Sequence, residues 1–273
     1  MNRAVVTRLG LSPMALNDYR IEPFTHEGIT HDVHHRGDGP CVLVAAEVPG
    51  ITPKVTEFAD RLVDLGMSVA MPSMFGTAGA ESSYPRAMGV IAKACVSKEF
   101  HCLAKRDSAP ATAWLRALAR KLHADHGGPG IGFVGMCFTG GFGLAMMLDD
   151  AVIAPVLSQP SQPFPIGAER KASVGLDDDE LRIVAERAEN GCPVLGLRFT
   201  SDPAVPAERF ETLRRVLGEN FVGVEITSPD KERHIPKNAH SVLTEHLIDE
   251  PGHPTREALD QVLEFLSGRL LSE

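Results

Sequence analysis

Short apolar runs alternate with longer amphipathic stretches along most of this chain, and this alternation constrains the fold more than any other feature. The short runs have the length of β-strands, and the stretches between them place apolar residues at helical spacing. Strands that alternate with helices form parallel sheets covered on both faces. We therefore expect an α/β fold, with a mostly parallel sheet and helices on both faces. The expected strands are residues 41–48, 67–71, 130–136, 151–157, 193–200 and 221–227, and the expected helices are residues 52–65, 109–126, 138–148, 177–189, 207–217 and 255–270.

Two regions depart from this alternation. Residues 1–40 are polar and rich in histidine, and we expect edge strands and their turn there. Residues 73–107 are rich in Gly, Ser and Ala and lack a sheet pattern, so we expect an irregular, cap-like insertion. The length fits one large α/β domain or two small ones, and we expect a single domain over residues 1–273.

Composition excludes several classes of protein. The formal net charge of −9 argues against a nucleic-acid partner. No apolar run approaches the length of a membrane-spanning helix, and residues 1–20 lack the continuous apolar core of a secretory signal. The five cysteines, an odd number, indicate reduced thiols and predict a cytoplasmic location without a membrane partner.

The most informative segment is residues 132–141, GFVGMCFTGG, where an apolar strand runs straight into a glycine-rich helix. Such a strand–turn–helix junction lifts one side chain, here Cys137, above the edge of the sheet. The helix N-terminus behind the turn favours negative charge and therefore the thiolate form of a cysteine. A free cysteine can instead be a small buried apolar residue. The glycines around this turn favour a nucleophile.

An acid and a base are expected to follow the nucleophile in that order. Asp202 comes directly after the expected strand 193–200, where a carboxylate can reach a histidine over the sheet. Two candidate histidines lie in the loop after the next strand. His240 lies in a compact apolar stretch, whereas His234 lies in a charged one. We favour His240 because a catalytic base must be held at hydrogen-bond distance.

Other histidines and cysteines are expected to be structural. His31, His34 and His35 form the pattern HDVHH, but alternation along an exposed strand explains it, and no carboxylate or cysteine pattern completes a metal site. We therefore expect no metal ion. The remaining cysteines lack both a base and a sharp turn beside them: Cys41, Cys95, Cys102 and Cys192.

With these residues identified, the chain resembles the dienelactone hydrolase (carboxymethylenebutenolidase) family of the α/β-hydrolase superfamily, from about residue 41 to the C-terminus. The run VAAEV at residues 44–48 is similar to the family's first core strand, which ends in a glutamate. The elbow GMCF-x-G around Cys137 is similar to Gly-x-Cys-x-Gly-Gly. DPAVP at residues 202–206 is similar to the acid loop Asp-x-x-Val-Pro, and AHS at residues 239–241 to the histidine loop Gly-His-Ser.

The resemblance implies an α/β-hydrolase fold and a Cys137–Asp202–His240 triad. The expected activity is hydrolysis of a small-molecule ester or lactone through a thiol acyl-enzyme, without a metal or organic cofactor. A hydrolase-fold binding module without turnover is an alternative, as is thioester cleavage or acyl transfer at the same site. The substrate and the oligomeric state stay open.

The resemblance also assigns roles to three further residues. Glu47 is expected to contact the resting thiol and to help generate the thiolate when substrate binds. A glutamate at the end of an apolar strand is otherwise unexpected, because burying an unpaired charge is costly. The backbone N–H groups of Phe138 and Val48 are expected to form the oxyanion hole.

Two positions depart from the family pattern. Thr139 stands where the family usually has glycine, which predicts a wider approach of helix and strand. Thr244 stands where small dienelactone hydrolases carry an arginine that helps to hold the substrate carboxylate. Residues 73–106 also look longer than in those enzymes, with Arg86 or Arg106 as candidate replacement contacts. The sequence therefore predicts the machinery better than the substrate.

Overall fold

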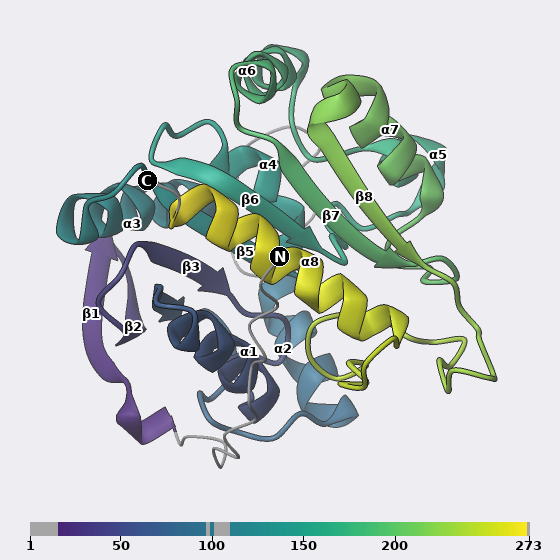
Figure 1. The fold of residues 1–273 in the computed structure, drawn as a ribbon, viewed down its shortest axis with the longest axis horizontal. Coiled ribbons are helices and arrows are strands. Elements are labelled where there is room, and N and C mark those ends of the chain that lie inside the picture. Colours follow the sequence, from purple (N-terminus) through teal and green to yellow (C-terminus); the bar gives the residue numbers. More distant parts are fainter. Residues whose placement is uncertain (1–15, 97–98, 101–109, 272–273) are drawn as a thin grey trace, which may run out of the picture.

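The structure is a computed structural model that describes residues 16–96, 99–100 and 110–271. At its centre, eight strands of the described residues form one sheet, and the predicted α/β-hydrolase architecture is confirmed (Figure 1). In spatial order the strands are β1 (Arg20–His26), β2 (Ile29–Arg36), β4 (Ser68–Pro72), β3 (Cys41–Ala45), β5 (Ile131–Met136), β6 (Val152–Ser158), β7 (Val194–Phe199) and β8 (Phe221–Ile226).

The direction of the strands divides the sheet into two parts. β1 and β2 form an antiparallel hairpin at one edge, as expected for the polar N-terminal region, and β2 is also antiparallel to β4. The neighbours from β4 to β8 are parallel. Because parallel strands end at the same edge, the segments that follow β3, β5, β6 and β7 leave the sheet together, where ligands of such sheets bind.

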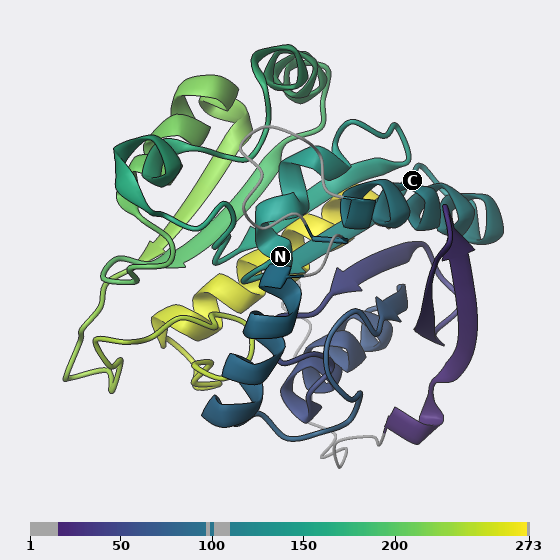
Figure 2. The same ribbon diagram turned by 180° about the vertical axis from the view of Figure 1, so that it is seen from behind.

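Helices cover both faces of the sheet. α1 (Pro53–Asp64) and α8 (Pro254–Leu270) lie on one face, and α3 (Pro110–His126) and α7 (Ala207–Leu217) lie on the other (Figure 1, Figure 2). The remaining helical segments are α2 (Tyr84–Val96), α4 (Gly143–Met146), α5 (Gly167–Ala172), α6 (Asp178–Glu189) and the 3-10 turns Leu16–Asp18, Thr139–Phe142 and Gly218–Asn220.

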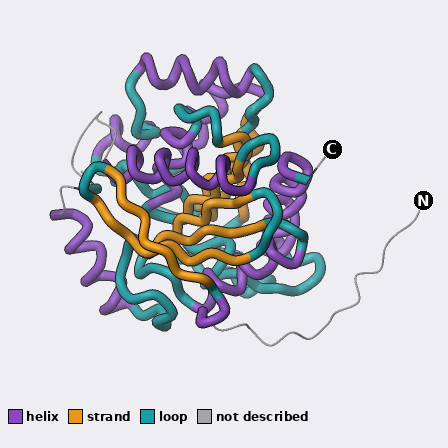
Figure 3. The backbone as a smooth tube through the Cα atoms, turned by 90° about the vertical axis from the view of Figure 1, so that its left-hand side faces the viewer, coloured by secondary structure: helices purple, strands orange, loops and turns teal. Residues whose placement is uncertain are grey.

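Alternate side chains of the inner strands enter separate apolar cores. On β5, Val134 and Met136 join the core beneath α1 and α8, whereas Ile131 and Phe133 join the core beneath α3. The side view shows the twisted sheet between its helical layers (Figure 3). Burial on both faces explains why these strands are continuous apolar runs in the sequence.

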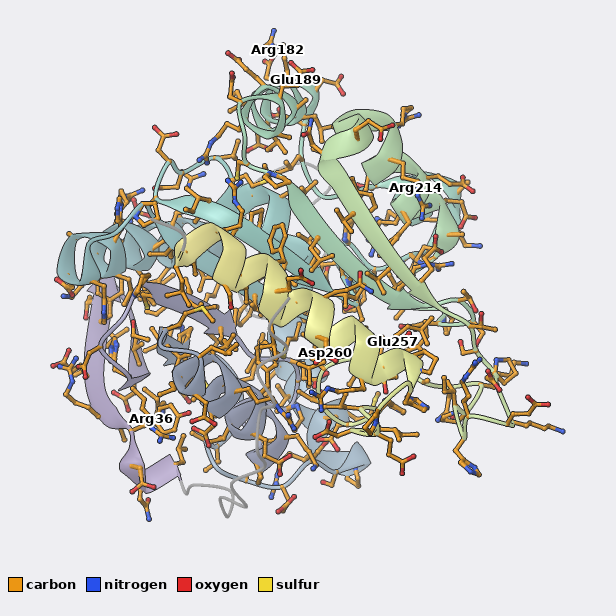
Figure 4. All side chains as sticks on the ribbon, in the orientation of Figure 1. Arg36, Arg182, Glu189, Arg214, Glu257 and Asp260 are labelled. Carbon is orange, nitrogen blue, oxygen red and sulfur yellow. The ribbon has the colours of Figure 1, made fainter. Side chains whose placement is uncertain are left out.

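The ends of the helices and the sides that they turn toward the sheet agree with their sequences. Asp177 and Glu180 form a capping box at the start of α6, which satisfies N–H groups that have no partner within the helix. Charged side chains such as Arg182 on α6 and Glu257 and Asp260 on α8 project outward (Figure 4). The apolar side chains of α8 face the sheet.

Two predicted elements are wrong. Residues 84–96, within the segment predicted to be irregular, form α2, and the helix-forming residues there outweigh the single Gly89. The helix predicted for residues 138–148 is a 3-10 turn followed by the short α4, because three glycines in this stretch weaken a regular helix. Residues 97–98 and 101–107 of the predicted insertion lie outside the described residues.

Candidate active site

Cys137 lies on a sharp turn at the carboxyl end of β5. Its φ is 56°, in the left-handed region that side chains rarely adopt. The turn passes directly into the 3-10 helix that begins at Thr139. Holding a residue in this conformation costs on the order of 1–3 kcal/mol of free energy, which contacts in the surrounding structure must offset. The strained turn is the one that the sequence predicts around Cys137.

Glycine is required around this turn because backbones approach closely. A Cβ at Gly135 would lie 2.4 Å from the carbonyl oxygen of Thr139. A Cβ at Gly140 would lie 2.6 Å from the carbonyl oxygen of Ser158 at the end of β6. Neither position accepts a side chain without backbone movement, so the two glycines fix the geometry that exposes Cys137.

Thr139 ties the turn to the neighbouring strand. Its hydroxyl donates to the carbonyl oxygen of Ala45 at 2.6 Å and accepts from the backbone N–H of Met136 at 2.9 Å. The side chain is fully buried. The hydroxyl thus bonds the end of β3 directly, and the wider approach expected from the glycine-to-threonine change stays a prediction.

Asp202 and His240 form a hydrogen-bonded pair above the sheet. Asp202 follows β7 and is 5% exposed, and its Oδ2 lies 2.6 Å from Nδ1 of His240. This contact holds the imidazole with Nδ1–H toward the carboxylate and leaves Nε2 for chemistry. His234 is exposed and its backbone N–H donates to Lys231, so of the two candidate histidines the structure brings His240 to the acid.

The imidazole of His240 also bonds the thiol of Cys137. Burial opposes protonation of the ring, but the charge of Cys137 and the hydrogen bonds to Asp202 and Cys137 outweigh it. Together these neighbours hold the pKa of His240 well above its usual value. The imidazole beside Cys137 therefore favours its charged form. Sulfur, imidazole and carboxylate lie in one hydrogen-bonded chain.

Comparison with known proteins identifies the family of this chain. A model of the dienelactone hydrolase family matches residues 30–267. The chain belongs to the dienelactone hydrolase family. The match covers most of β2 and most of α8, so the resemblance seen in the motifs extends over almost the whole chain. A search of curated proteins found no match.

Solved structures of dienelactone hydrolase-like proteins share the fold at low sequence identity. The dienelactone hydrolase of Anabaena variabilis is 14% identical, with a TM-score of 0.56 over 93% of this chain and 98% of that one. A dienelactone hydrolase-like promiscuous phosphotriesterase from metagenomic libraries is 16% identical, with a TM-score of 0.57 over 92% of this chain and 98% of that one. A 2,6-dihydroxy-pseudo-oxynicotine hydrolase is 16% identical, with a TM-score of 0.55 over 94% of this chain and 70% of that one. At these identities the likeness shows the fold.

In this dienelactone hydrolase family member, Glu47 does not contact the thiol. Its carboxylate is 3% exposed and accepts hydrogen bonds from Ser241 Oγ at 2.5 Å, from Gln159 Nε2 at 3.2 Å and from the hydroxyl of Thr244. The expected contact with Cys137 is thus replaced by contacts with the loop that carries His240. Thr244, at the position of the family's arginine, makes one of these contacts through a neutral hydroxyl.

Two backbone N–H groups follow the ends of neighbouring strands. β3 and β5 pair in parallel, with Ala45 opposite Gly135, so the segments that carry Val48 and Phe138 leave the same edge. Among the described residues, neither N–H donates to a backbone acceptor outside regular elements. Their role as an oxyanion hole stays a prediction.

Ser161 is a neighbour of the thiol that the motifs do not indicate. It lies in the loop after β6, and its Oγ is 3.5 Å from Sγ of Cys137. The loop leaves the carboxyl end of a central parallel strand, which is the general signal that could have pointed to it. The segment SQPSQP otherwise resembles an ordinary turn.

The other described cysteines differ from Cys137 in their surroundings. Burial raises the pKa of the Cys41 thiol to about 12 and also raises the pKa of Cys192. Both are therefore poor nucleophiles, as expected for structural residues. The side chain of Cys95 and all of Cys102 lie outside the described residues.

The histidines of β2 do not form a metal site. His31 Nε2 lies 2.7 Å from Oε1 of Glu99, while His34 is buried rather than on an exposed strand as expected. Within residues 16–96, 99–100 and 110–271, no group of three His, Cys, Asp or Glu side chains could hold a metal ion. No helix in this part of the chain is both long and apolar enough to cross a membrane.

Proposed function

We propose that this protein is a cysteine-dependent hydrolase of a small-molecule ester or lactone, with Cys137, His240 and Asp202 as its catalytic triad. The observation that carries the proposal is the hydrogen-bonded chain from the strained Cys137 through His240 to Asp202. The family and its hydrolase fold agree with it.

In the proposed mechanism, the Cys137 thiolate attacks the carbonyl carbon of the substrate and forms a C–S bond. The backbone N–H groups of Phe138 and Val48 bind the resulting oxyanion. The C–O bond to the leaving group then breaks, and the imidazolium of His240 gives that oxygen its proton, which leaves an acyl-enzyme.

Water completes the reaction. His240, now neutral, takes a proton from water as it attacks the thioester carbon, and Asp202 holds the imidazole in orientation throughout. Collapse of the second tetrahedral intermediate breaks the C–S bond and restores the thiolate–imidazolium pair. Each step uses only residues of this chain, so the proposal requires neither a metal nor an organic cofactor. The odd number of cysteines supports a reducing, cytoplasmic setting.

A screen of small esters and lactones, with dienelactone included, tests the proposed activity. Hydrolysis of p-nitrophenyl acetate by the purified protein distinguishes an enzyme from a binding module that retains only the fold. Transfer of the acyl group to an added alcohol or amine, or faster cleavage of thioesters than of oxygen esters, would instead favour the acyltransferase or thioesterase alternative.

Neutral esters and bulkier lactones are expected to be better substrates than dienelactone. Thr244 is buried and bonded to Glu47, so it offers no cation to a substrate carboxylate. Loss of a charge-assisted contact costs about 1.5–3 kcal/mol, or about ten- to a hundredfold in affinity. Cys137 packs against the same apolar core as four other partly buried side chains, namely Val48, Met74, Val90 and Phe164.

Comparison of kcat/KM for dienelactone, neutral aryl esters and larger lactones tests this preference. Arg86 is exposed and donates to the backbone of Glu81, and Arg106 lies outside the described residues. A clear preference for dienelactone would show that another cation replaces the missing arginine and would contradict the expectation.

Glu47 is proposed as a positioning residue that acts through Ser241 and Thr244. We expect Glu47→Gln to lower kcat about tenfold with little change in KM, because one carboxylate acceptor next to the His240 loop becomes a donor. Glu245→Gln makes the same change at an exposed position nearby and is expected to have no effect. Equal effects of the two variants, or an effect of Glu47→Gln on KM alone, would contradict this role.

A further inference from the structure

A buried hydroxyl lies beside the sulfur of Cys137. Ser161 is 4% exposed, and its Oγ lies 3.5 Å from Sγ of Cys137. Among the residues that the structure describes, this hydroxyl has no other side-chain or backbone partner. A buried hydroxyl without another partner must donate to the sulfur or leave its proton unsatisfied.

The loop that carries Ser161 is fixed to the turn that carries Cys137. The backbone N–H of Ser161 donates to the carbonyl oxygen of Cys137 at 2.9 Å. The N–H of Cys137 donates to the carbonyl oxygen of Ser158 at 3.0 Å. These bonds on both sides of the loop set the position of the hydroxyl relative to the sulfur. The contact therefore does not depend on a mobile side chain alone.

A buried arginine holds the same loop from the other side. The guanidinium of Arg209, on α7, is 1% exposed and donates to the carbonyl oxygens of Pro160 at 2.6 Å and Pro163 at 2.5 Å. These two residues flank Ser161. A buried cation bonded to several carbonyl groups is rigid, because moving it would leave charged donors without partners. The loop is thus preorganised around Ser161.

The charge at the sulfur decides which atom donates. In the proposed function the sulfur reacts as a thiolate, and a thiolate accepts a hydrogen bond from the hydroxyl within reach. A carboxylate at this place would repel that thiolate, whereas a hydroxyl can donate to it. Ser161 can therefore donate a hydrogen bond to the thiolate, which the carboxylate of Glu47 cannot.

We propose that Ser161 is a catalytic residue whose hydroxyl donates a hydrogen bond to the Cys137 thiolate and stabilises it in the resting enzyme. This inference rests on the proposed function, in which that thiolate is the nucleophile. When sulfur attacks, its charge moves to the substrate oxygen, and the hydrogen bond from Ser161 weakens. Ser161 thus sets how much thiolate is present at a given pH rather than stabilising the transition state.

The pH dependence of Cys137 alkylation tests the inference. Iodoacetamide reacts with the thiolate, so the rate, followed by mass spectrometry of the peptide that contains Cys137, rises with pH through a midpoint. We expect Ser161→Ala to move this midpoint up by about one pH unit, since a hydrogen bond to a charged group has that order of effect. Ser161→Thr retains a hydroxyl and is expected to retain the midpoint, whereas Ser161→Val is expected to behave like the alanine variant.

Ser68→Ala is the matched control. Ser68 is equally buried and hydrogen-bonded, but it begins β4 at the opposite end of the sheet, so the midpoint is expected to stay at the wild-type value. In kcat/KM, Ser161→Ala should shift only the acid limb of the pH profile, with the high-pH plateau kept. A structural role alone would lower the plateau instead.

An unchanged midpoint in folded Ser161→Ala and Ser161→Val would overturn the inference, as would a shift in Ser161→Thr as large as that in Ser161→Val. Alkylation needs no turnover, so it reports on Ser161 even if no ester is hydrolysed. Absence of hydrolysis with a shifted midpoint would contradict the proposed function and leave the Ser161–thiolate contact supported.

Discussion

Cys137→Ala is expected to abolish ester hydrolysis while the protein stays folded. The variant removes the sulfur that forms the C–S bond, and loss of a triad nucleophile costs on the order of 10³-fold or more in kcat. Alanine fits the strained turn, because φ of 56° already carries a Cβ there. Steady-state hydrolysis of p-nitrophenyl acetate gives the activity, and circular dichroism with thermal unfolding checks the fold.

Cys95→Ala and Cys102→Ala are the controls for this result, and both are expected to retain most activity. Cys137→Ser is expected to retain at most a trace, because a serine hydroxyl at this turn is activated less readily than a thiol. Wild-type activity in Cys137→Ala would rule out the proposed mechanism.

His240→Ala is expected to lower kcat by several orders of magnitude. The substitution removes the imidazole that pairs with both Asp202 and Cys137. Without the positive charge of the ring the thiolate is less stable, and the leaving group has no proton donor, so both the attack and the collapse become slower. The remaining rate should also rise with pH over a higher range than in the wild type, because the sulfur must ionise without its cation.

His234→Ala is the matched histidine variant. His234 is exposed on the same loop, and the structure gives its side chain no contact with Asp202 or Cys137. Its activity and pH profile are expected to stay near wild type. If His234→Ala were the inactive variant and His240→Ala the active one, the base would have been assigned to the wrong histidine.

Much of the fold and the order of the three candidate triad residues follow from local sequence signals. Each core strand is a continuous apolar run because it is buried on both faces, so strand and helix positions emerge from pattern alone. Cys137 lies in a short glycine-rich junction whose geometry depends on adjacent residues. Asp202 and the loop of His240 come after successive strands, and parallel strands bring their ends to one edge.

Contacts between distant segments could not be predicted in this way. Ser161 and Cys137 are separated by 24 positions, and only the pairing of β5 with β6 brings their segments together. Glu47 and Thr244 are separated by 197 positions, so the sequence did not indicate that the Thr244 hydroxyl bonds the glutamate. Thr139 likewise gained a partner on β3 that its own segment does not reveal.

Local helix signals in the sequence also gave wrong predictions where tertiary contacts compete with them. The stretch after Cys137 has apolar residues at helical spacing, yet its glycines are needed for close approach to β6, and the helix breaks into a 3-10 turn and α4. The sequence did not indicate helix α2, because small residues and flanking Gly and Ser suggested an irregular loop.

Trapping the acyl-enzyme tests the central claim most directly. Wild-type protein would be mixed with p-nitrophenyl acetate, quenched with acid before the steady state, digested and analysed by mass spectrometry. The account predicts one acetyl group on the peptide that contains Cys137, bound as a thioester that hydroxylamine removes, and a longer-lived adduct in His240→Ala. Acetylation of a different residue, or turnover with no acetyl group on Cys137 at any time, would contradict it.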